Sequence, residues 1–246
     1  MESETRGPFY LAVEGVIGVG KTTLARLLKE ALSCEVLLEV FEENPFLSDF
    51  YGDRARYAFQ TQIFFLLSRY QQQVKMIPQT LAAGRSIVSD YCFDKDSLFA
   101  GINVRGDELT MYYRVHEALA EKIPEPNLIL YLRASTDTLM QRILSRDRPY
   151  ERDMERAYIE ELNQAYEDFF AQPRLQERLL VIETDHLNPI TCPEDLEYII
   201  QRIRQSLQLT IGLATRLLGK LGLRESLAQL VHLRFAGLGL PKLFTN

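Results

Sequence analysis

The stretch that decides the fold is "LAVEGVIGVGKTTLARLL", residues 11–28. It joins an apolar run to an amphipathic pattern through residues 15–22, which fit G-x-x-x-x-G-K-[ST]. Glycines let the backbone curl until successive N–H groups point at one anion, and a following helix directs its positive end to the same place. The stretch therefore predicts a phosphate-binding loop (P-loop) that holds a nucleoside triphosphate.

The residues of this loop have separate expected tasks. We expect Lys21 to neutralise the β- and γ-phosphates and the Thr22 hydroxyl to reach Mg²⁺. The segment expected to bind the nucleotide is Gly15, Val16, Ile17, Gly18, Val19, Gly20, Lys21, Thr22 and Thr23. ATP, or another nucleoside triphosphate, and Mg²⁺ are the predicted cofactors.

Five short apolar runs alternate with helical patterns. The runs are Phe9–Glu14, Glu35–Phe41, Ser86–Asp90, Leu128–Leu132 and Leu179–Glu183. Most are nearly continuous in hydrophobicity, as are strands that are buried on both faces of a parallel sheet. The helical patterns are Lys21–Leu32, Arg54–Met76, Asp107–Lys122, Thr136–Arg146, Met154–Phe170 and Pro193–Leu207. They predict an α/β P-loop kinase fold, a five-stranded parallel sheet flanked by helices on both faces, in one domain over residues 1–207.

The last segment, residues 208–246, has a different character. It carries five Lys or Arg and one acidic residue, and Leu213, Leu217, Leu218 and Leu221 recur at helical spacing. We expect a helical C-terminal extension of unknown role that packs on its own domain or on a second subunit. A helix on a membrane surface is the weaker alternative, because the charge density is modest.

The composition narrows the class of protein. The 246 residues are 46% hydrophobic and 25% charged, and the formal net charge of −6 argues against a protein that binds nucleic acid. The three cysteines, Cys34, Cys92 and Cys192, form no CxxC pair, which favours free thiols in the reducing cytoplasm. A polar start without an apolar core, and no apolar run of about 18 residues, predict neither a secretory signal nor a membrane partner.

Glu39 lies near the end of the second predicted strand. Ligands of such sheets bind beyond the carboxyl ends of the strands, so a carboxylate there can accept a proton from an attacking hydroxyl. Glu42 and Glu43 follow closely and stay open as alternative bases.

Two polar residues share one face of the long helical pattern at Arg54–Met76. Gln62 and Arg69 are seven residues apart, and aromatic residues flank them. An amide that both donates and accepts hydrogen bonds suits the edge of a nucleobase. An ordinary buried helix with satisfied polar groups is the alternative interpretation.

Three arginines follow each other in "QRILSRDRPYE". Arg142, Arg146 and Arg148 stand at i, i+4 and i+6. Alone they would indicate a solvated charged face, but beside a P-loop they predict a flap that closes over the triphosphate, stabilises its charge and excludes water.

Taken together, these motifs resemble the deoxyribonucleoside kinase family, and most closely its bacterial deoxyguanosine/deoxyadenosine kinase branch. The resemblance covers roughly residues 9–170 and is carried by "GVIGVGKTT", "EVFEENPFLSDFY", "YAFQTQIFFLLSR", "SDYCFDKDSLFA" and "QRILSRDRPYE". The tail after Gln208 lies beyond it.

The resemblance implies a role for each matching residue. Glu39 would activate the 5′-hydroxyl of the nucleoside, and Arg142, Arg146 and Arg148 would be the flap arginines. The expected substrate contacts are Tyr51 and Glu151 to the sugar 3′-hydroxyl, Gln62 to the base, and Arg69 near the base and the reacting end. Family analogy also implies a homodimer.

The segment after the third predicted strand departs from the family pattern. Many members carry an acidic-Arg-Ser triplet there, and this chain reads Ser89-Asp90-Tyr91. Asp90 is expected on the substrate and Mg²⁺ side of the site, although in the alternative alignment it takes the place of the arginine. What replaces that arginine stays open, with Arg69 serving alone as one alternative.

The predicted function is transfer of the γ-phosphoryl group of ATP to the 5′-hydroxyl of a deoxynucleoside in nucleotide salvage. A purine substrate, deoxyguanosine or deoxyadenosine, is expected from the family branch, while deoxycytidine and thymidine stay open. A thymidylate-type monophosphate kinase and a non-catalytic nucleotide-binding scaffold are the alternatives. A GTP-driven switch is disfavoured, because the chain has no N-K-x-D stretch.

Overall fold

The structure, a computed structural model, describes the backbone of residues 7–220. The chain divides after Ser206 into two units, and the first unit contains the sheet and the site. The sequence expectations for residues 1–6 and 221–246 fall outside the described part of the chain. Among the residues described, no helix combines the length and the apolar character that crossing a membrane requires.

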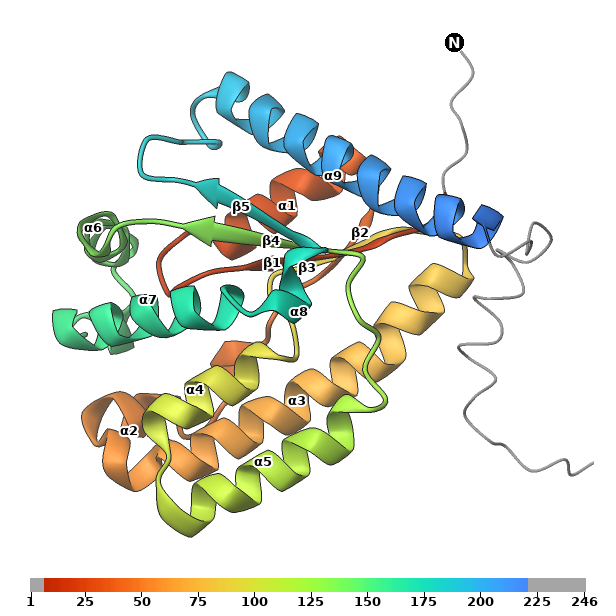
Figure 1. Ribbon diagram of the computed structural model, residues 1–246. Coiled ribbons are helices and arrows are strands. Elements are labelled where there is room, and N and C mark those ends of the chain that lie inside the picture. The colour runs from red at the N-terminus through yellow and green to blue at the C-terminus, as the bar shows by residue number, and fades with distance from the viewer. Residues whose placement is uncertain (1–6, 221–246) are drawn as a thin grey trace, which may run out of the picture. The chain divides into compact units, whose positions relative to one another are not determined.

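Five parallel strands form one sheet in the order β2-β3-β1-β4-β5 (Figure 1). They are β1 (Tyr10–Glu14), β2 (Glu35–Leu37), β3 (Ile87–Ser89), β4 (Leu128–Arg133) and β5 (Leu179–Glu183). Every residue of β1 and β3 is buried, because helices cover both faces of the sheet. The predicted five-stranded parallel sheet is confirmed.

Helices cover the sheet from both sides (Figure 1). On one face lie α1 (Lys21–Leu32) and the first turns of α9 (Pro193–Lys220), where Arg204 donates to the carbonyl of Ala31. On the other side lie α3 (Arg54–Ala82), α4 (Lys95–Asn103), α7 (Arg156–Phe170) and α8 (Pro173–Gln176), and α5 (Gly106–Ala120) packs on α3 and α4 farther from the sheet. The helix α6 (Thr136–Arg146) follows β4 at the carboxyl edge of the sheet.

Several elements differ from the sequence prediction. The second strand ends at Leu37 rather than Phe41, because the backbone N–H of Glu39 donates to the side chain of Asp90 at 2.7 Å instead of continuing the ladder. A 3₁₀ helix, η1 (Phe41–Glu43), follows. The helix α3 continues through Pro78 to Ala82, and α2 (Leu47–Gly52), α4 and α8 were not predicted.

One core cluster joins the sheet to α3. Its apolar side chains gain stability by leaving water, and its tyrosine hydroxyls keep hydrogen-bond partners. The hydroxyl of Tyr10 lies 3.1 Å from that of Ser89, and Tyr91 donates to Gln72 on α3 at 2.7 Å. This packing holds α3 against β2 and β3, so its polar face has a fixed position at the carboxyl edge of the sheet.

Gly15 begins the P-loop where only glycine fits. Its φ is +147°, and a Cβ atom there would lie 2.4 Å from the carbonyl oxygen of Leu132 on β4. We expect Gly15→Ala to lower the free energy of unfolding by about 2 kcal/mol or more, because backbone atoms have to move. Urea denaturation measures this change.

Gly52 provides the matched control. Nothing lies within 4 Å of a Cβ at Gly52, at the end of α2, and its φ is outside the left-handed region. Gly52→Ala should therefore change stability by no more than about 0.5 kcal/mol. Equal stability of the two variants would contradict the steric argument for Gly15.

Candidate active site

The P-loop lies between β1 and α1 and presents its backbone to an anion. Gly20 is the N-cap of α1, and no side chain caps the helix there. The ammonium group of Lys21 donates across the loop to the carbonyls of Gly15 at 2.6 Å and Val16 at 3.2 Å. An uncapped helix start beside a lysine is the arrangement that binds phosphate groups.

The side chain of Glu14 holds the start of the P-loop in place through hydrogen bonds. Its carboxylate is fully buried and accepts from the backbone N–H groups of Gly15 at 3.2 Å and Cys92 at 2.5 Å. The hydroxyl of Tyr166 on α7 donates to the same carboxylate at 3.2 Å. The P-loop is thereby fixed to the segment after β3 and to α7.

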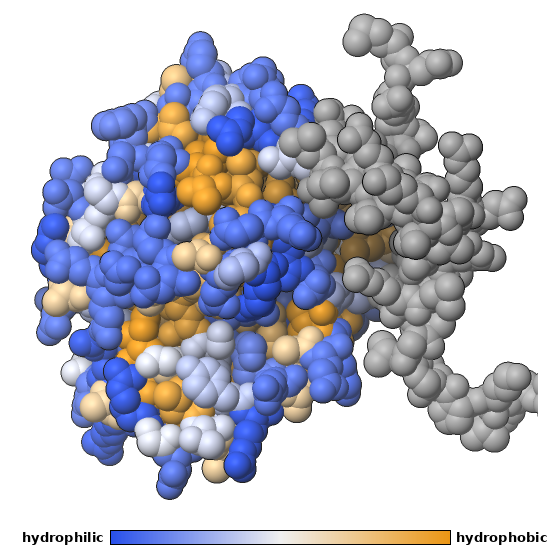
Figure 2. Space-filling model, in the orientation of Figure 1, coloured by the Kyte–Doolittle hydropathy of each residue, from blue (hydrophilic) through white to orange (hydrophobic). Residues whose placement is uncertain are grey.

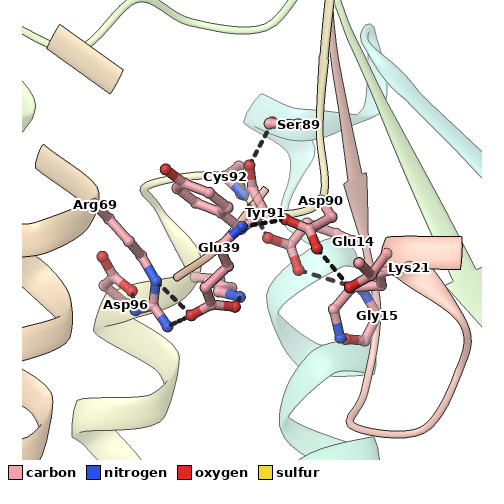
Figure 3. Close-up of polar contacts among 12 residues, drawn as sticks. Glu14, Gly15, Lys21, Glu39, Arg69, Ser89, Asp90, Tyr91, Cys92 and Asp96 are labelled. Carbon is pink, nitrogen blue, oxygen red and sulfur yellow. Dashed lines mark hydrogen bonds and ion pairs between the residues drawn. The ribbon is translucent and has the colours of Figure 1, made fainter. Parts of the chain in front are cut away.

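Asp90, directly after β3, joins two parts of the site (Figure 3). One carboxylate oxygen accepts from the Thr22 hydroxyl at 2.5 Å, and the other from the backbone N–H of Glu39 at 2.7 Å. A single buried carboxylate therefore connects the start of α1 to the chain that leaves β2.

The carboxylate of Glu39 lies between two cations. Its Oε1 accepts from Nε of Arg69 at 2.9 Å and from a terminal nitrogen of the same guanidinium, and its Oε2 accepts from Lys95 at 3.2 Å. The other terminal nitrogen of Arg69 pairs with Asp96, which is fully buried (Figure 3). Buried charges need such partners, and here each charge has at least one.

These contacts set the charge state of Glu39. Burial raises the pKa of Glu39, but Arg69, Lys95 and Lys21 together hold it well below its usual range. Burial, and then the positive charge of Lys95, lower the pKa of Lys21 from 10.5 to about 8. Glu39 is therefore a carboxylate that can accept a hydrogen bond from a hydroxyl group.

One cavity gathers these groups with residues of α2, α3 and the segment after α6. Its lining is Ile17, Gly18, Lys21, Thr22, Glu39, Phe41, Leu47, Phe50, Tyr51, Gln62, Phe65, Arg69, Asp90, Lys95, Phe99, Arg146, Arg148, Tyr150, Glu151 and Tyr158. The polar residues predicted for substrate lie together here, although they come from distant parts of the sequence. Apolar and aromatic side chains form the rest of the wall, as in a pocket for a planar ligand.

The basic flap lines this cavity, and its arginines form ion pairs with a carboxylate of the same segment. Arg146 donates to the buried Glu151 at 2.5 and 3.1 Å, and Arg148 lies 3.6 Å from the same carboxylate. Tyr150, in the 3₁₀ helix η2 (Pro149–Glu151), stacks on Tyr51 with ring centroids 5.9 Å apart. Aromatic packing therefore holds the flap against α2.

Some predicted residues lie outside the cavity lining. Arg142 donates to the backbone carbonyls of Val19 at 3.2 Å, Thr184 at 2.6 Å and Leu187 at 3.4 Å, so it binds loops rather than facing the cavity. Thr23 is exposed on α1. The role expected for Arg142 at the triphosphate stays a prediction.

The residues of the P-loop also differ in whether they line the cavity. The side chains of Val16 and Val19 are buried, while Ile17 and Gly18 line the cavity. Of the two alternative bases, Glu43 is exposed, and the side chain of Glu42 is outside the described part of the structure.

Sequence reasoning assigned no role to Lys95, Asp96 or Tyr150. Lys95 and Asp96 begin α4, and the signal that could have found them is two charged residues shortly after a strand end. Tyr150 follows the flap arginines, and an aromatic residue at the tip of a flap is a signal for docking.

Thr22 and Asp90 are the residues suited to hold Mg²⁺. Their oxygens lie 2.5 Å apart, next to Lys21 in the cavity lining. Mg²⁺ prefers oxygen ligands and is commonly held by one or two carboxylates together with substrate phosphates. The described residues contain no cluster of three or more His, Cys, Asp or Glu that could hold a metal ion.

A family model for deoxynucleoside kinases matches residues 11–208. The chain belongs to the deoxynucleoside kinase family. It is 33% identical over 201 residues to the deoxyguanosine kinase of Bacillus subtilis, covering 80% of this chain and 96% of that protein. It is 36% identical over 165 residues to the deoxyadenosine kinase of Dictyostelium discoideum, covering 65% and 66%.

A solved structure of a deoxynucleoside kinase has the same fold. The deoxyadenosine kinase from M. mycoides, with the products dCMP and a flexible dCDP bound, matches with a TM-score of 0.69 and 25% identity. The match covers 80% of this chain and 98% of that one. The predicted P-loop kinase fold and the prediction of an ATP-dependent deoxynucleoside kinase are confirmed.

The pair between Arg69 and Asp96 predicts a stability effect in this kinase. Asp96→Ala leaves the guanidinium of Arg69 in a buried place with one carboxylate partner instead of two. We expect a loss of about 3 kcal/mol in the free energy of unfolding, as for other broken buried ion pairs. Thermal and urea denaturation measure it.

Asp49→Ala is the matched control, because Asp49 is exposed on α2. It should change stability by no more than about 0.5 kcal/mol. If Asp96→Ala were no less stable than Asp49→Ala, the buried pair would not stabilise the fold.

Proposed function

We propose that this kinase transfers the γ-phosphoryl group of ATP to the 5′-hydroxyl of a purine deoxynucleoside, deoxyguanosine or deoxyadenosine, in nucleotide salvage. One observation carries the proposal: Glu39 lines the same cavity as Lys21 of the P-loop, Gln62 and a set of aromatic side chains. The purine substrate is supported by the names of relatives, which include deoxyguanosine and deoxyadenosine kinases.

The transfer step assigns a task to each charged group. The 5′-oxygen bonds to the γ-phosphorus while the bond to the β,γ-bridging oxygen breaks, and that electron pair leaves with ADP. Glu39 accepts the hydroxyl proton on Oε2, which has one partner at 3.2 Å, whereas Oε1 accepts two bonds from Arg69. Lys21, Arg146 and Arg148 stabilise the charge on the phosphoryl oxygens.

Thr22 and Asp90 would hold Mg²⁺ in this proposal. When bound, the ion neutralises negative charge on the β- and γ-phosphates. The carboxylate of Asp90 also positions the backbone of Glu39, so the same residue would serve both sides of the reaction.

The nucleoside would occupy the end of the cavity away from the P-loop. Gln62 can donate to and accept from a base edge, and Arg69 lies on the same face of α3. The guanidinium carbon of Arg69 lies 4.7 Å from the ring centre of Phe65. Tyr51 and Glu151 would bind the 3′-hydroxyl at the flap.

The charges at that end favour a nucleoside over a nucleotide acceptor. A monophosphate kinase needs cations for the phosphate that the acceptor already carries. Arg69, the arginine expected beside the base, is neutralised by Glu39 and Asp96. The arrangement therefore supports a neutral sugar alcohol as the acceptor, and the complete set of charged groups disfavours a scaffold.

We further propose a cytoplasmic homodimer. The thiols of all three cysteines are free, which fits a reducing compartment. Leu67 on α3 and Met111 on α5 are exposed large apolar side chains on two helices that pack together, and Figure 2 shows apolar patches between polar residues on the visible face. Helices beside the sheet are thus the proposed dimer contact.

A substrate panel tests the proposed function. Four deoxynucleosides, their ribonucleoside counterparts and the deoxynucleoside monophosphates are each incubated with ATP and Mg²⁺, and products are separated by chromatography. We expect kcat/KM for deoxyguanosine or deoxyadenosine to exceed the others by at least about tenfold. Phosphorylation of monophosphates instead, or no ADP with any acceptor, would contradict the proposal.

The base assignment is tested by Glu39→Gln. The amide keeps the shape of the side chain but cannot accept the hydroxyl proton, so kcat with the preferred deoxynucleoside should fall by about 10²- to 10⁴-fold. Steady-state kinetics measure the change. Glu43→Gln is the comparison, because Glu43 is exposed nearby; a larger loss in that variant would move the base to Glu43.

A further inference from the structure

We propose that Lys95 is a catalytic residue: its ammonium group passes from Glu39 to the transferred phosphoryl group, which frees Glu39 Oε2 for the attacking hydroxyl. The inference rests on the proposed function, since it adds a second lysine to the same transfer step.

The position of Lys95 is the first argument. It is the first residue of α4, it is 3% exposed, and it lines the cavity together with Lys21 and Glu39. Burying an ammonium group is costly unless a partner or a function compensates for it. A lysine kept at the wall of a substrate cavity is therefore placed to meet an anion.

The two lysines face the same space, and this is the second argument. The positive charge of Lys95 acts on Lys21, while Lys21 itself is bound to backbone carbonyls and Lys95 to one carboxylate oxygen. Glu39 offsets part of the repulsion between the two ammonium groups, and a second anion between them would reduce it further. A phosphoryl group held by the P-loop supplies that anion.

The third argument compares the two cations on Glu39. Arg69 is fixed by two bonds to Oε1 and by its pair with the buried Asp96. Lys95 makes one hydrogen bond, to Oε2 at 3.2 Å, and its ammonium group lies 5.7 Å from the ring centre of Tyr91 and 5.9 Å from that of Phe99, which are weaker contacts on a flexible side chain. Arg69 can hold the carboxylate in place while Lys95 moves.

The movement fits the needs of the reaction. As charge develops on the phosphoryl oxygens, Lys95 donates to one of them, and Oε2 of Glu39 loses a competing donor. The 5′-hydroxyl proton then passes to Oε2 as the new O–P bond forms and the electron pair of the old bond leaves on ADP. No further reactant is required.

Lys95→Met, Lys95→Arg and the control Lys75→Met test the inference, since Lys75 is exposed on α3. Values of kcat and KM are measured for the preferred deoxynucleoside and ATP, together with melting temperature and nucleoside affinity by calorimetry. We expect Lys95→Met to lower kcat at least about 100-fold with KM for the nucleoside changed less than about threefold, and Lys95→Arg to recover at least tenfold. Lys75→Met should match the unaltered enzyme.

A second measurement tests the inference even if Lys95→Met does not fold. In Lys95→Ala, added ethylammonium should raise kcat in a saturable way without changing the melting temperature. A kcat of Lys95→Met within fivefold of the unaltered enzyme, a loss confined to nucleoside KM, or no rescue of Lys95→Ala would overturn the inference. Absence of purine deoxynucleoside phosphorylation by the unaltered enzyme would instead contradict the proposed function.

Discussion

The carboxylate of Asp90 links the start of α1 to the segment that follows β2. Strand β3 lies between β2 and β1 in the sheet, so the residue that follows β3 stands between the chains that leave its two neighbours. Asp90 uses this place to bind the Thr22 hydroxyl after β1 and the backbone N–H of Glu39 after β2. Sheet order and one side chain together bring Glu39 next to the P-loop.

The charged groups around Glu39 come from three separate elements and hold one another in place. Arg69 comes from α3, Lys95 and Asp96 from α4, and Glu39 from the segment after β2, so their ion pairs also connect these elements. Oriented charges in a buried place act strongly on a reaction because they do not have to reorganise as it proceeds. The same pairs explain why the site depends on the correct packing of α3 and α4 against the sheet.

Local patterns in the sequence predicted much of the fold. The P-loop, α1 and the strands β4 and β5 follow from nearly continuous apolar runs and helical spacing, which depend on neighbours in the chain. The early end of β2 did not follow, because it depends on Asp90, about fifty residues away. Distant contacts of this kind are invisible to periodicity.

The same limit applies to the site. Lys21 was predicted from the P-loop motif, Glu39 from a strand end and Gln62 from a helix face, and all three line one cavity. Arg142 and Arg146 share a helix face, yet Arg142 turns to loops beyond β1 and β5 whose position only the folded sheet determines. The backbone carbonyls of Val19 and Leu187 accept from Arg142 whatever side chains those two residues carry, whereas replacing Arg142 removes all of these contacts together.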